Sequence, residues 1–366
     1  MLKNSLRHIA LLFLKLGFIS FGGPAVHIAM MEEEVVRKRK WMSHEHFLDL
    51  ISATNLIPGP NSTEMSMHCG REQAGWKGLI VAGFCFITPA VLLTALFAWF
   101  YANYGQLPSV KPFIYGIKPA IIAVVIAAII PLAKKSVTGW FYALLGFAVL
   151  AACFCGLPEI LVLFGAGFLG MLFHALTINR NTPVLFAPMG SIALSNTKLF
   201  LTFLKIGSIL YGSGYVLFSF LDTELVQKGY LSREQLADAI AVGQFTPGPV
   251  FSSATFIGWQ INGCYGALAA TIGIFLPSFL LVALLNPLIP ALRKSRIMSA
   301  FLNAVNVASV ALILFTCIQM GRDTMTSWQG LCIGSISIFL LLFLKKINSA
   351  WIVIGGGISG YILQLF

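Results

Sequence analysis

The sequence predicts an all-α polytopic membrane protein built from two inverted-topology repeats. Three observations support this fold class: long apolar stretches, an internal sequence repeat, and basic loops that change places between the halves. The chain of 366 residues is 58% hydrophobic and only 10% charged, whereas soluble domains carry roughly 25% charged residues. So few polar groups could not cover a surface that faces water, so lipid is the solvent that fits this composition.

Ten stretches of the chain are apolar and long enough to cross a membrane as helices. The hydrocarbon core is about 30 Å thick, so a helix that rises about 1.5 Å per residue needs about 20 apolar residues. Backbone polar groups find no other partner in lipid, so such runs must be helical. We expect crossings at residues 9–30, 78–104, 112–133, 138–155 and 159–177 of the first half, and at residues 200–221, 264–286, 298–319, 328–344 and 349–365 of the second.

Short motifs of the first half recur in the same order in the second half. Phe13–Gly17 (FLKLG) recurs as Phe203–Gly207 (FLKIG), and the Pro-Gly-Pro motif at residues 58–60 recurs at residues 247–249. The offset between matched positions stays between 188 and 190 residues. Chance is a poor explanation for such order and spacing, so the chain contains an internal repeat. The two repeats are expected at residues 1–190 and 191–366.

Clusters of Lys and Arg lie in different loops of the two halves. In the first half they lie at residues 37–40 and 134–135, and the loop near Gly105 has none. In the second half they lie at residues 293–296, in the loop equivalent to Gly105, and at residues 345–346. Because cytoplasmic loops are enriched in Lys and Arg, this exchange predicts that the repeats have opposite orientations in the membrane.

A short amphipathic segment precedes each Pro-Gly-Pro motif, at residues 43–57 and 232–246. Pro58 ends the first segment, because proline disfavours helical geometry in the residue before it. Pro60 suits the first turn of a new helix. Each repeat is therefore expected to hold about five crossings and one re-entrant helical hairpin. Broken helices at matching positions of inverted repeats point to the substrate site of a transporter.

The helix that follows each Pro-Gly-Pro motif begins with unpaired backbone N–H groups, which carry a partial positive charge and suit an oxyanion. Hydroxyl and amide side chains surround both helix starts. Two such ends could hold a dianion without a buried salt bridge. The substrate-binding candidates around the two motifs are Asn55, Gly59, Pro60, Asn61, Ser62, Thr63, Gln244, Gly248, Ser252 and Ser253.

Two lysines and two glycines are further substrate-binding candidates. Lys15 and Lys205 occupy matching places in apolar segments, where a charge at mid-bilayer costs at least ~2.5 kcal/mol. Attraction of the anion and snorkelling of the side chain explain them equally well. Gly22 and Gly23 let backbones approach closely, which helix packing alone would explain, and breaks that line the substrate path are the second interpretation.

Coupling of transport to protons requires a carboxylate that changes its protonation in a partly dry site. Glu64 is the preferred candidate, because it follows the helix start and would compete with an anion unless it is protonated. Asp49 and Asp238 are a matched acidic pair, for which a polar helix face is the slightly favoured alternative. His27 and His68 could relay protons, but a single structural hydrogen bond is the favoured interpretation for each.

The motifs together resemble the chromate ion transporter (CHR) family in its long, two-domain form. The resemblance is carried by Phe21–Pro24 (FGGP), Arg39–Ser43 (RKWMS), Leu56–Thr63 (LIPGPNST), Ala74–Gly78 (AGWKG) and Gln244–Pro249 (QFTPGP). It implies export of chromate across the cytoplasmic membrane of a prokaryote, driven by the proton-motive force, with chromate resistance as the result. The second copy has Val250 and Phe251 in place of Asn61 and Ser62, so the two half-sites cannot contact one substrate identically.

Several alternatives to chromate export stay open. Sulfate or another oxyanion could be the substrate, and a channel could replace a transporter. An intramembrane enzyme acting on a lipid-like substrate is a third alternative, although neither an H-E-x-x-H nor a G-x-S-x-G motif occurs. We therefore expect no enzymatic activity, no cofactor and no metal. The expected partners are the anion, protons and membrane lipid, not nucleic acid, and the oligomeric state is left open, a homodimer included.

Overall fold

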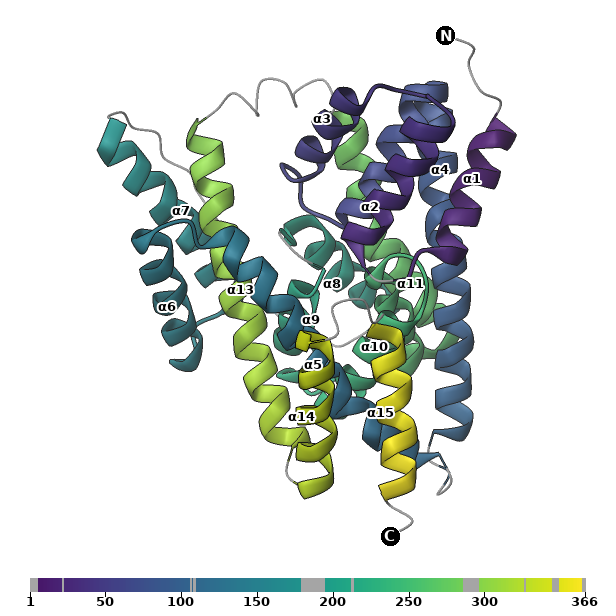
Figure 1. The fold of residues 1–366 in the computed structure, drawn as a ribbon, viewed down its shortest axis with the longest axis vertical. Helices are drawn as coiled ribbons and strands as arrows, with labels where there is room; N and C mark the ends of the chain where they lie inside the picture. The colour runs from purple at the N-terminus through teal and green to yellow at the C-terminus, as the bar shows by residue number, and fades with distance from the viewer. Residues whose placement is uncertain are drawn as a thin grey trace.

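The computed structural model describes residues 6–21, 23–105, 107, 110–178, 195–211, 214–285, 296–325, 327–343 and 349–363. These residues form helices and connecting turns with no strand, which confirms the all-α prediction. The chain starts at the upper end of Figure 1 and finishes at the lower end. The boundary expected between residues 190 and 191 lies outside the described residues.

The first expected crossing, residues 9–30, is wrong because the chain folds back on itself. Helix α1 (Leu6–Ile19) ends at a break, and α2 (Pro24–Glu32) begins after Gly23, whose φ is +86°. Lys15 Nζ then lies 3.1 Å from Glu34 Oε1. In one straight helix these residues would be about 28 Å apart. The segment is a helical hairpin that continues into a π-helical turn, η1 (Glu33–Lys38).

The crossing expected at residues 200–221 is wrong for the same reason. Helix α8 (Asn196–Ile209) is followed by α9 (Val216–Leu221) and a second π-helical turn, η2 (Asp222–Val226). Lys205 Nζ lies 2.6 Å from Glu224 Oε1, as Lys15 does from Glu34. The ion pair therefore recurs at matched positions, and both repeats begin with a folded-back hairpin.

The Pro-Gly-Pro segments form the helix-turn-helix arrangement that the sequence predicts. Helix α3 (His44–Thr54) begins at Ser43, whose hydroxyl accepts a hydrogen bond from the His46 N–H, and the turn leads into α4 (Asn61–Tyr104). Helix α10 (Arg233–Phe245) leads through a 3₁₀ turn, η3 (Val250–Ser252), into α11 (Ser253–Leu285). The expected arms are confirmed, and α3 is only about 16 Å long.

Helices α4 and α11 each reverse direction near their first third. Helix α4 has non-helical backbone at Ala74 and Gly75, and Gly70 and Gly78 pack so tightly that a Cβ on either would collide with the other's backbone. Helix α11 reverses at Asn262 and Gly263. Residues 76–104 and 264–285 are thus the long membrane-crossing arms, close to the expected ranges 78–104 and 264–286.

Within the part of the chain that the structure describes, four helical segments are long and apolar enough to cross a membrane, and four further apolar helices are shorter. The long ones are Asn61–Tyr104, Lys111–Ser136, Val250–Leu284 and Ile297–Arg322, and the shorter ones are Trp140–Phe154, Glu159–His174, Trp328–Phe343 and Ser349–Leu363. Within this set lie α5 (Lys111–Ser136), α6 (Trp140–Phe154), α7 (Glu159–Ile178), α13 (Arg296–Thr324), α14 (Trp328–Phe343) and α15 (Ser349–Leu363).

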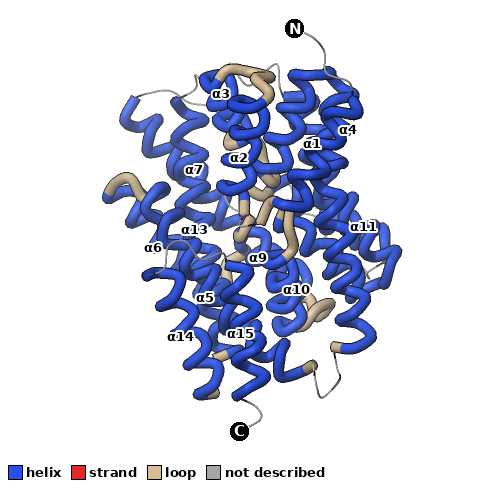
Figure 2. The backbone as a smooth tube through the Cα atoms, turned by 45° about the vertical axis from the view of Figure 1, so that its right-hand side comes forward, coloured by secondary structure: helices blue, strands red, loops and turns tan. Residues whose placement is uncertain are grey.

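The two repeats exchange their last two helices. Helices α6 and α7 of the first repeat pack on α13 of the second, whereas α14 and α15 pack on α5 of the first. Gly170 meets Ala304 in one of these interfaces, and Gly360 meets Gly116 at the matched place in the other. Figures 1 and 2 show α1–α3 in the upper half of the molecule and α9 and α10 in the lower half, as inverted repeats require.

Candidate functional site

The two repeats meet at their backbone breaks through a reciprocal pair of hydrogen bonds. The Gly59 N–H donates to the Leu210 carbonyl at 2.8 Å, and the Gly248 N–H donates to the Ser20 carbonyl at 2.9 Å. Ser20 and Leu210 follow α1 and α8, whose last carbonyls have no partner within their own helices. A contact exchanged between matched residues implies an approximate two-fold axis. Both Pro-Gly-Pro turns therefore lie at the junction of the repeats.

The glycine of each motif is required by its backbone geometry. Gly59 has φ +139° and Gly248 has φ +91°, a region that other residues rarely adopt. A side chain at Gly59 would also collide with Glu64 and Ser278, and one at Gly248 would lie 2.9 Å from Ala90 Cβ. Below, the first half-site means residues 58–64 with Ser278, and the second half-site means residues 244–253 with Ala90 and Thr94.

The first half-site holds a fully buried carboxyl group. Glu64 has no exposed surface, and its carboxylate oxygens make no well-aligned hydrogen bond among the described residues; the Ser278 hydroxyl is the polar group beside them. Thr63 Oγ1 and Ser278 Oγ are also buried without a partner there. Nearer the surface, Asn61 Nδ2 donates to Asn55 Oδ1 at 2.9 Å. The structure thus brings the predicted residues Asn55 and Gly59–Glu64 together.

The second half-site has hydroxyl and amide groups where the first has a carboxyl group. Ser253 occupies the position equivalent to Glu64, and its buried Oγ has no partner among the described residues. Thr94 Oγ1 donates to Ser252 Oγ at 3.2 Å. The Tyr215 hydroxyl donates to Gln244 Oε1 at 3.4 Å, which leaves the buried Gln244 Nε2 without an acceptor in the described structure.

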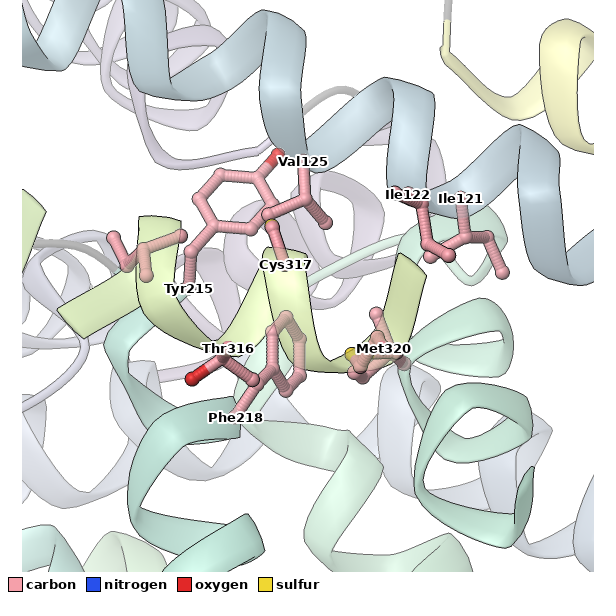
Figure 3. Close-up of a pocket in the computed structure, with 10 residues that line it drawn as sticks. Ile121, Ile122, Val125, Tyr215, Phe218, Thr316, Cys317 and Met320 are labelled. Atoms are coloured by element: carbon pink, nitrogen blue, oxygen red, sulfur yellow. The ribbon is translucent and has the colours of Figure 1, made fainter. Parts of the chain in front are cut away.

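A small cavity lies beside the second half-site, between α5, α9, α10 and α13 (Figure 3). Its volume of about 10 Å³ is close to the minimum that one water molecule needs. The lining includes Tyr215, whose hydroxyl reaches Gln244, together with apolar side chains such as Ile122, Phe218 and Met320. An apolar space of this size does not suit a dianion, so the cavity adds no substrate site.

The predicted acidic pair, Asp49 and Asp238, lies in two different environments. Asp49 is exposed, whereas Asp238 is 4% exposed and accepts a hydrogen bond of 2.6 Å from the Tyr101 hydroxyl. Lys118 Nζ lies 3.5 Å from Glu234 Oε1, one helical turn before Asp238 on α10. Of the matched pair, Asp238 has the dry surroundings that proton coupling requires.

The two predicted lysines are held in ion pairs with buried glutamates. The Lys15 and Lys205 side chains are about half exposed, whereas their partners Glu34 and Glu224 are almost fully buried. Burial alone would raise the pKa of Glu34, but hydrogen bonds from three basic side chains lower it to about 2. In this structure the charge of each lysine is directed at a carboxylate of its own hairpin.

The two predicted histidines are buried in the first repeat. His27 Nε2 donates to the Ser20 carbonyl at 3.1 Å, and its ring lies edge-on to Phe86. The Ser20 carbonyl therefore accepts hydrogen bonds from both Gly248 and His27. His27 thus helps to position the carbonyl that makes one of the two hydrogen bonds of the junction. His68 is buried in the first arm of α4.

Of the two glycines predicted to lie at the first break, Gly22 and Gly23, the structure describes only Gly23. Gly23 directly precedes α2 and has φ +86°, so it makes the turn of the hairpin. Gly22 lies outside the described residues. Gly23 therefore serves to reverse the chain, and neither close packing of two helices nor a straight membrane crossing would require its positive φ.

Sequence reasoning missed several residues that the structure places at or near the site. Ser278, Thr94 and Tyr101 lie far from their partners along the chain, and no local pattern marks them. Glu34 and Glu224 did leave a signal, because they are acidic at matched positions beside the matched lysines.

Comparison with known proteins decides the family. The family model described as "Chromate transporter" matches residues 7–171 and again residues 197–361. The chain belongs to the chromate transporter family. The two matched regions correspond to the two repeats, so the resemblance and the internal repeat are both confirmed.

Full-length relatives of this chromate transporter family member occur in bacteria and archaea. A probable chromate transport protein of Synechococcus elongatus is 28% identical over 98% of this chain and 95% of the relative. A chromate transport protein of Pseudomonas aeruginosa is 26% identical over 96% of this chain and 91% of its own. An uncharacterized transporter of Methanocaldococcus jannaschii is 27% identical over 97% and 94%. No solved structure matches the chain.

Proposed function

We propose that this chain is a secondary active transporter that exports chromate across the cytoplasmic membrane of a prokaryote. Export is driven by the proton-motive force and gives resistance to chromate. The family supports transport, and the chromate transport proteins among its relatives support the substrate. The observation that carries the mechanism is the reciprocal pair of hydrogen bonds between Gly59 and Leu210 and between Gly248 and Ser20.

This junction suits alternating access. Each bond joins a break in one repeat to a Pro-Gly-Pro turn in the other, so movement of one repeat against the other changes both. Broken helices at matching positions of two repeats form the central site of many secondary transporters. A tetrahedral dianion fits there because helix starts and hydroxyl groups supply hydrogen-bond donors. Sulfate has the same shape and charge, so it is the natural competitor.

Glu64 is the proposed proton carrier. An ionised carboxylate without hydrogen-bond donors is very costly in a site closed to water. Glu64 has no exposed surface, and its two oxygens make no well-aligned hydrogen bond among the described residues. A carboxyl group in such a place can hold a proton while the site is closed and release it when water enters. Asp238 is the second candidate, because it is buried and hydrogen-bonded to Tyr101.

Reconstitution tests this function. Purified protein in liposomes is given radiolabelled chromate with and without an imposed pH gradient, and unlabelled sulfate is the competitor. Accumulation against the chromate gradient, dependent on the pH gradient, is the expected result. Equilibration without accumulation would indicate a channel. If folded protein moves no chromate in either orientation, chromate is not the substrate, and turnover of a lipid-like substrate would then favour an enzyme.

A further inference from the structure

The two half-sites contain different sets of buried hydrogen-bonding atoms, because a carboxyl group is present only in the first and an amide donor only in the second. Buried polar groups in native proteins nearly always have partners, so each exception needs an explanation. Around the first Pro-Gly-Pro turn the unpaired atoms include both carboxylate oxygens of Glu64. Around the second they are Ser253 Oγ and Gln244 Nε2. An ionised carboxylate only accepts hydrogen bonds, whereas an amide nitrogen donates them and a hydroxyl can.

The residues that contact Gly59 and Gly248 also differ between the two half-sites. Gly59 packs against the Glu64 carboxylate and the Ser278 hydroxyl, whereas Gly248 packs against the methyl group of Ala90. The first half-site also offers the unpaired hydroxyls of Thr63 and Ser278. An anion bound by them would lie beside the Glu64 carboxylate, and like charges in a dry site repel strongly. The second half-site has no acidic group at the equivalent position, which is Ser253.

Gln244 is held so that its donor remains available. It lies at the end of α10, directly before the second Pro-Gly-Pro turn. The Tyr215 hydroxyl donates to its Oε1 at 3.4 Å, so its Nε2 faces away from that partner. Ser253 follows η3 directly and its N–H already donates to a carbonyl of that turn, so the free group of Ser253 is its buried hydroxyl. Both residues are more than nine-tenths buried, so a bound oxyanion would leave water and meet donors already in place.

We propose that the half-sites divide the two substrates: the oxyanion binds at the second half-site, to Ser253 and Gln244, and the proton binds at the first, on Glu64. This inference rests on the proposed function and adds which repeat holds which ion. The two ions then influence each other across the junction. An ionised Glu64 repels the dianion and a protonated Glu64 does not, so the anion binds more tightly as the pH falls. The anion and one proton then move in the same direction, and the membrane potential is the part of the proton-motive force that drives their net negative charge outward.

The test is equilibrium binding to the purified full-length protein without a gradient, at pH values from 5 to 9 spaced by about one unit. Radiolabelled sulfate is the probe for the pH series, because it stays a tetrahedral dianion over this range whereas chromate takes up a proton; chromate binding is measured at the alkaline end. Gln244→Glu and Asn55→Asp place the same new charge at matched positions of the two repeats. We expect Gln244→Glu to weaken binding by about 10-fold or more, because a hydrogen bond to a charged group is lost. Asn55→Asp weakens binding by a smaller factor.

Three further variants complete the design. Ser253→Ala, a small change that the fold tolerates, is expected to weaken binding about 10-fold while the pH dependence remains. Glu64→Gln is expected to bind sulfate with the same affinity at every pH. Asn103→Asp, an exposed position at the end of α4, controls for added charge outside the site. Monodisperse elution shows that each variant is folded.

Three possible results distinguish a failure of this inference from a failure of the proposed function. If Asn55→Asp weakens binding as much as Gln244→Glu, the anion is not confined to the second half-site, and the inference is overturned. The same holds if Glu64→Gln abolishes binding at every pH, because Glu64 would then be part of the anion site. If the wild-type protein binds neither chromate nor sulfate, the proposed function itself fails, whatever the variants do.

Discussion

Replacing Gly248 by alanine tests the junction directly. Gly248 has φ +91°, and its N–H donates to the Ser20 carbonyl at 2.9 Å. A left-handed conformation costs an L-residue roughly 1–2 kcal/mol. The new Cβ would lie 2.9 Å from Ala90 Cβ, and overpacking of this kind costs about 1–3 kcal/mol. We therefore expect Gly248→Ala to lose about 2–5 kcal/mol of stability, or to lose the junction.

A matched control is available in the same repeat. A Cβ on Gly214 would find its nearest neighbour, Phe251 Cε2, at 3.7 Å, an ordinary contact, and Gly214 has no positive φ. Thermal unfolding in detergent and chromate uptake into liposomes are measured for Gly248→Ala and Gly214→Ala. The first variant should unfold at a lower temperature and lose uptake, and the second should stay close to wild type. Equal behaviour of the two variants would refute the structural role given to the junction.

Three further predictions concern groups outside the junction. Glu34→Gln removes a carboxylate whose pKa is lowered to about 2, so the variant is less stable than wild type at pH 7; in thermal melts the difference should shrink below about pH 4.5 and vanish near pH 2, and a constant difference would contradict this. Tyr101→Phe removes the 2.6 Å hydrogen bond to Asp238 and should cost about 1–3 kcal/mol of unfolding free energy, with a smaller cost in an Asp238→Asn background; equal costs would show that the two side chains are not coupled. Lys205→Met should destabilise the protein by roughly 1 kcal/mol because the lysine is half exposed, and adding Glu224→Gln should restore stability; a stable double variant without chromate uptake would instead assign Lys205 to the substrate.

The helix-turn-helix around each Pro-Gly-Pro motif could be predicted because its signals are local. Proline disfavours helical geometry before it and suits the first turn after it. Serine is a favoured residue at the start of a helix, and the Ser232 hydroxyl accepts a hydrogen bond from the Gln235 N–H while the Gln235 side chain accepts one from the Ser232 N–H. These effects act within a few residues, so one sequence is enough to find them.

The folded-back hairpins could not be predicted from hydropathy. Residues 9–30 are mostly apolar and have the length of one crossing, so a sliding average of hydropathy does not reveal the turn. The turn depends on Gly23 and Pro24, and the ion pair of Lys15 with Glu34 shows the result. Lys205 and Glu224 have the same spacing in the second repeat as Lys15 and Glu34 in the first. Two lysine–glutamate pairs with the same spacing indicate that the two repeats share this fold-back.

The composition of the half-sites depends on long-range packing. Ser278 lies against Gly59, and Thr94 lies within hydrogen-bonding distance of Ser252, more than 150 residues along the chain. The sequence predicted which segments hold the site, because the broken helices mark it. It could not predict which side chains from the long arms of α4 and α11 complete each half-site, since no local pattern records that contact.

Proton movement driven by chromate is the measurement that tests the account most directly. Liposomes that contain a pH-sensitive dye and the reconstituted protein are exposed to a chromate gradient. The account predicts that wild-type protein moves protons when chromate flows, and that Glu64→Gln still passes chromate down its gradient but moves no protons. Unchanged proton movement in Glu64→Gln would contradict the assignment of Glu64 as the proton carrier at the junction of the repeats.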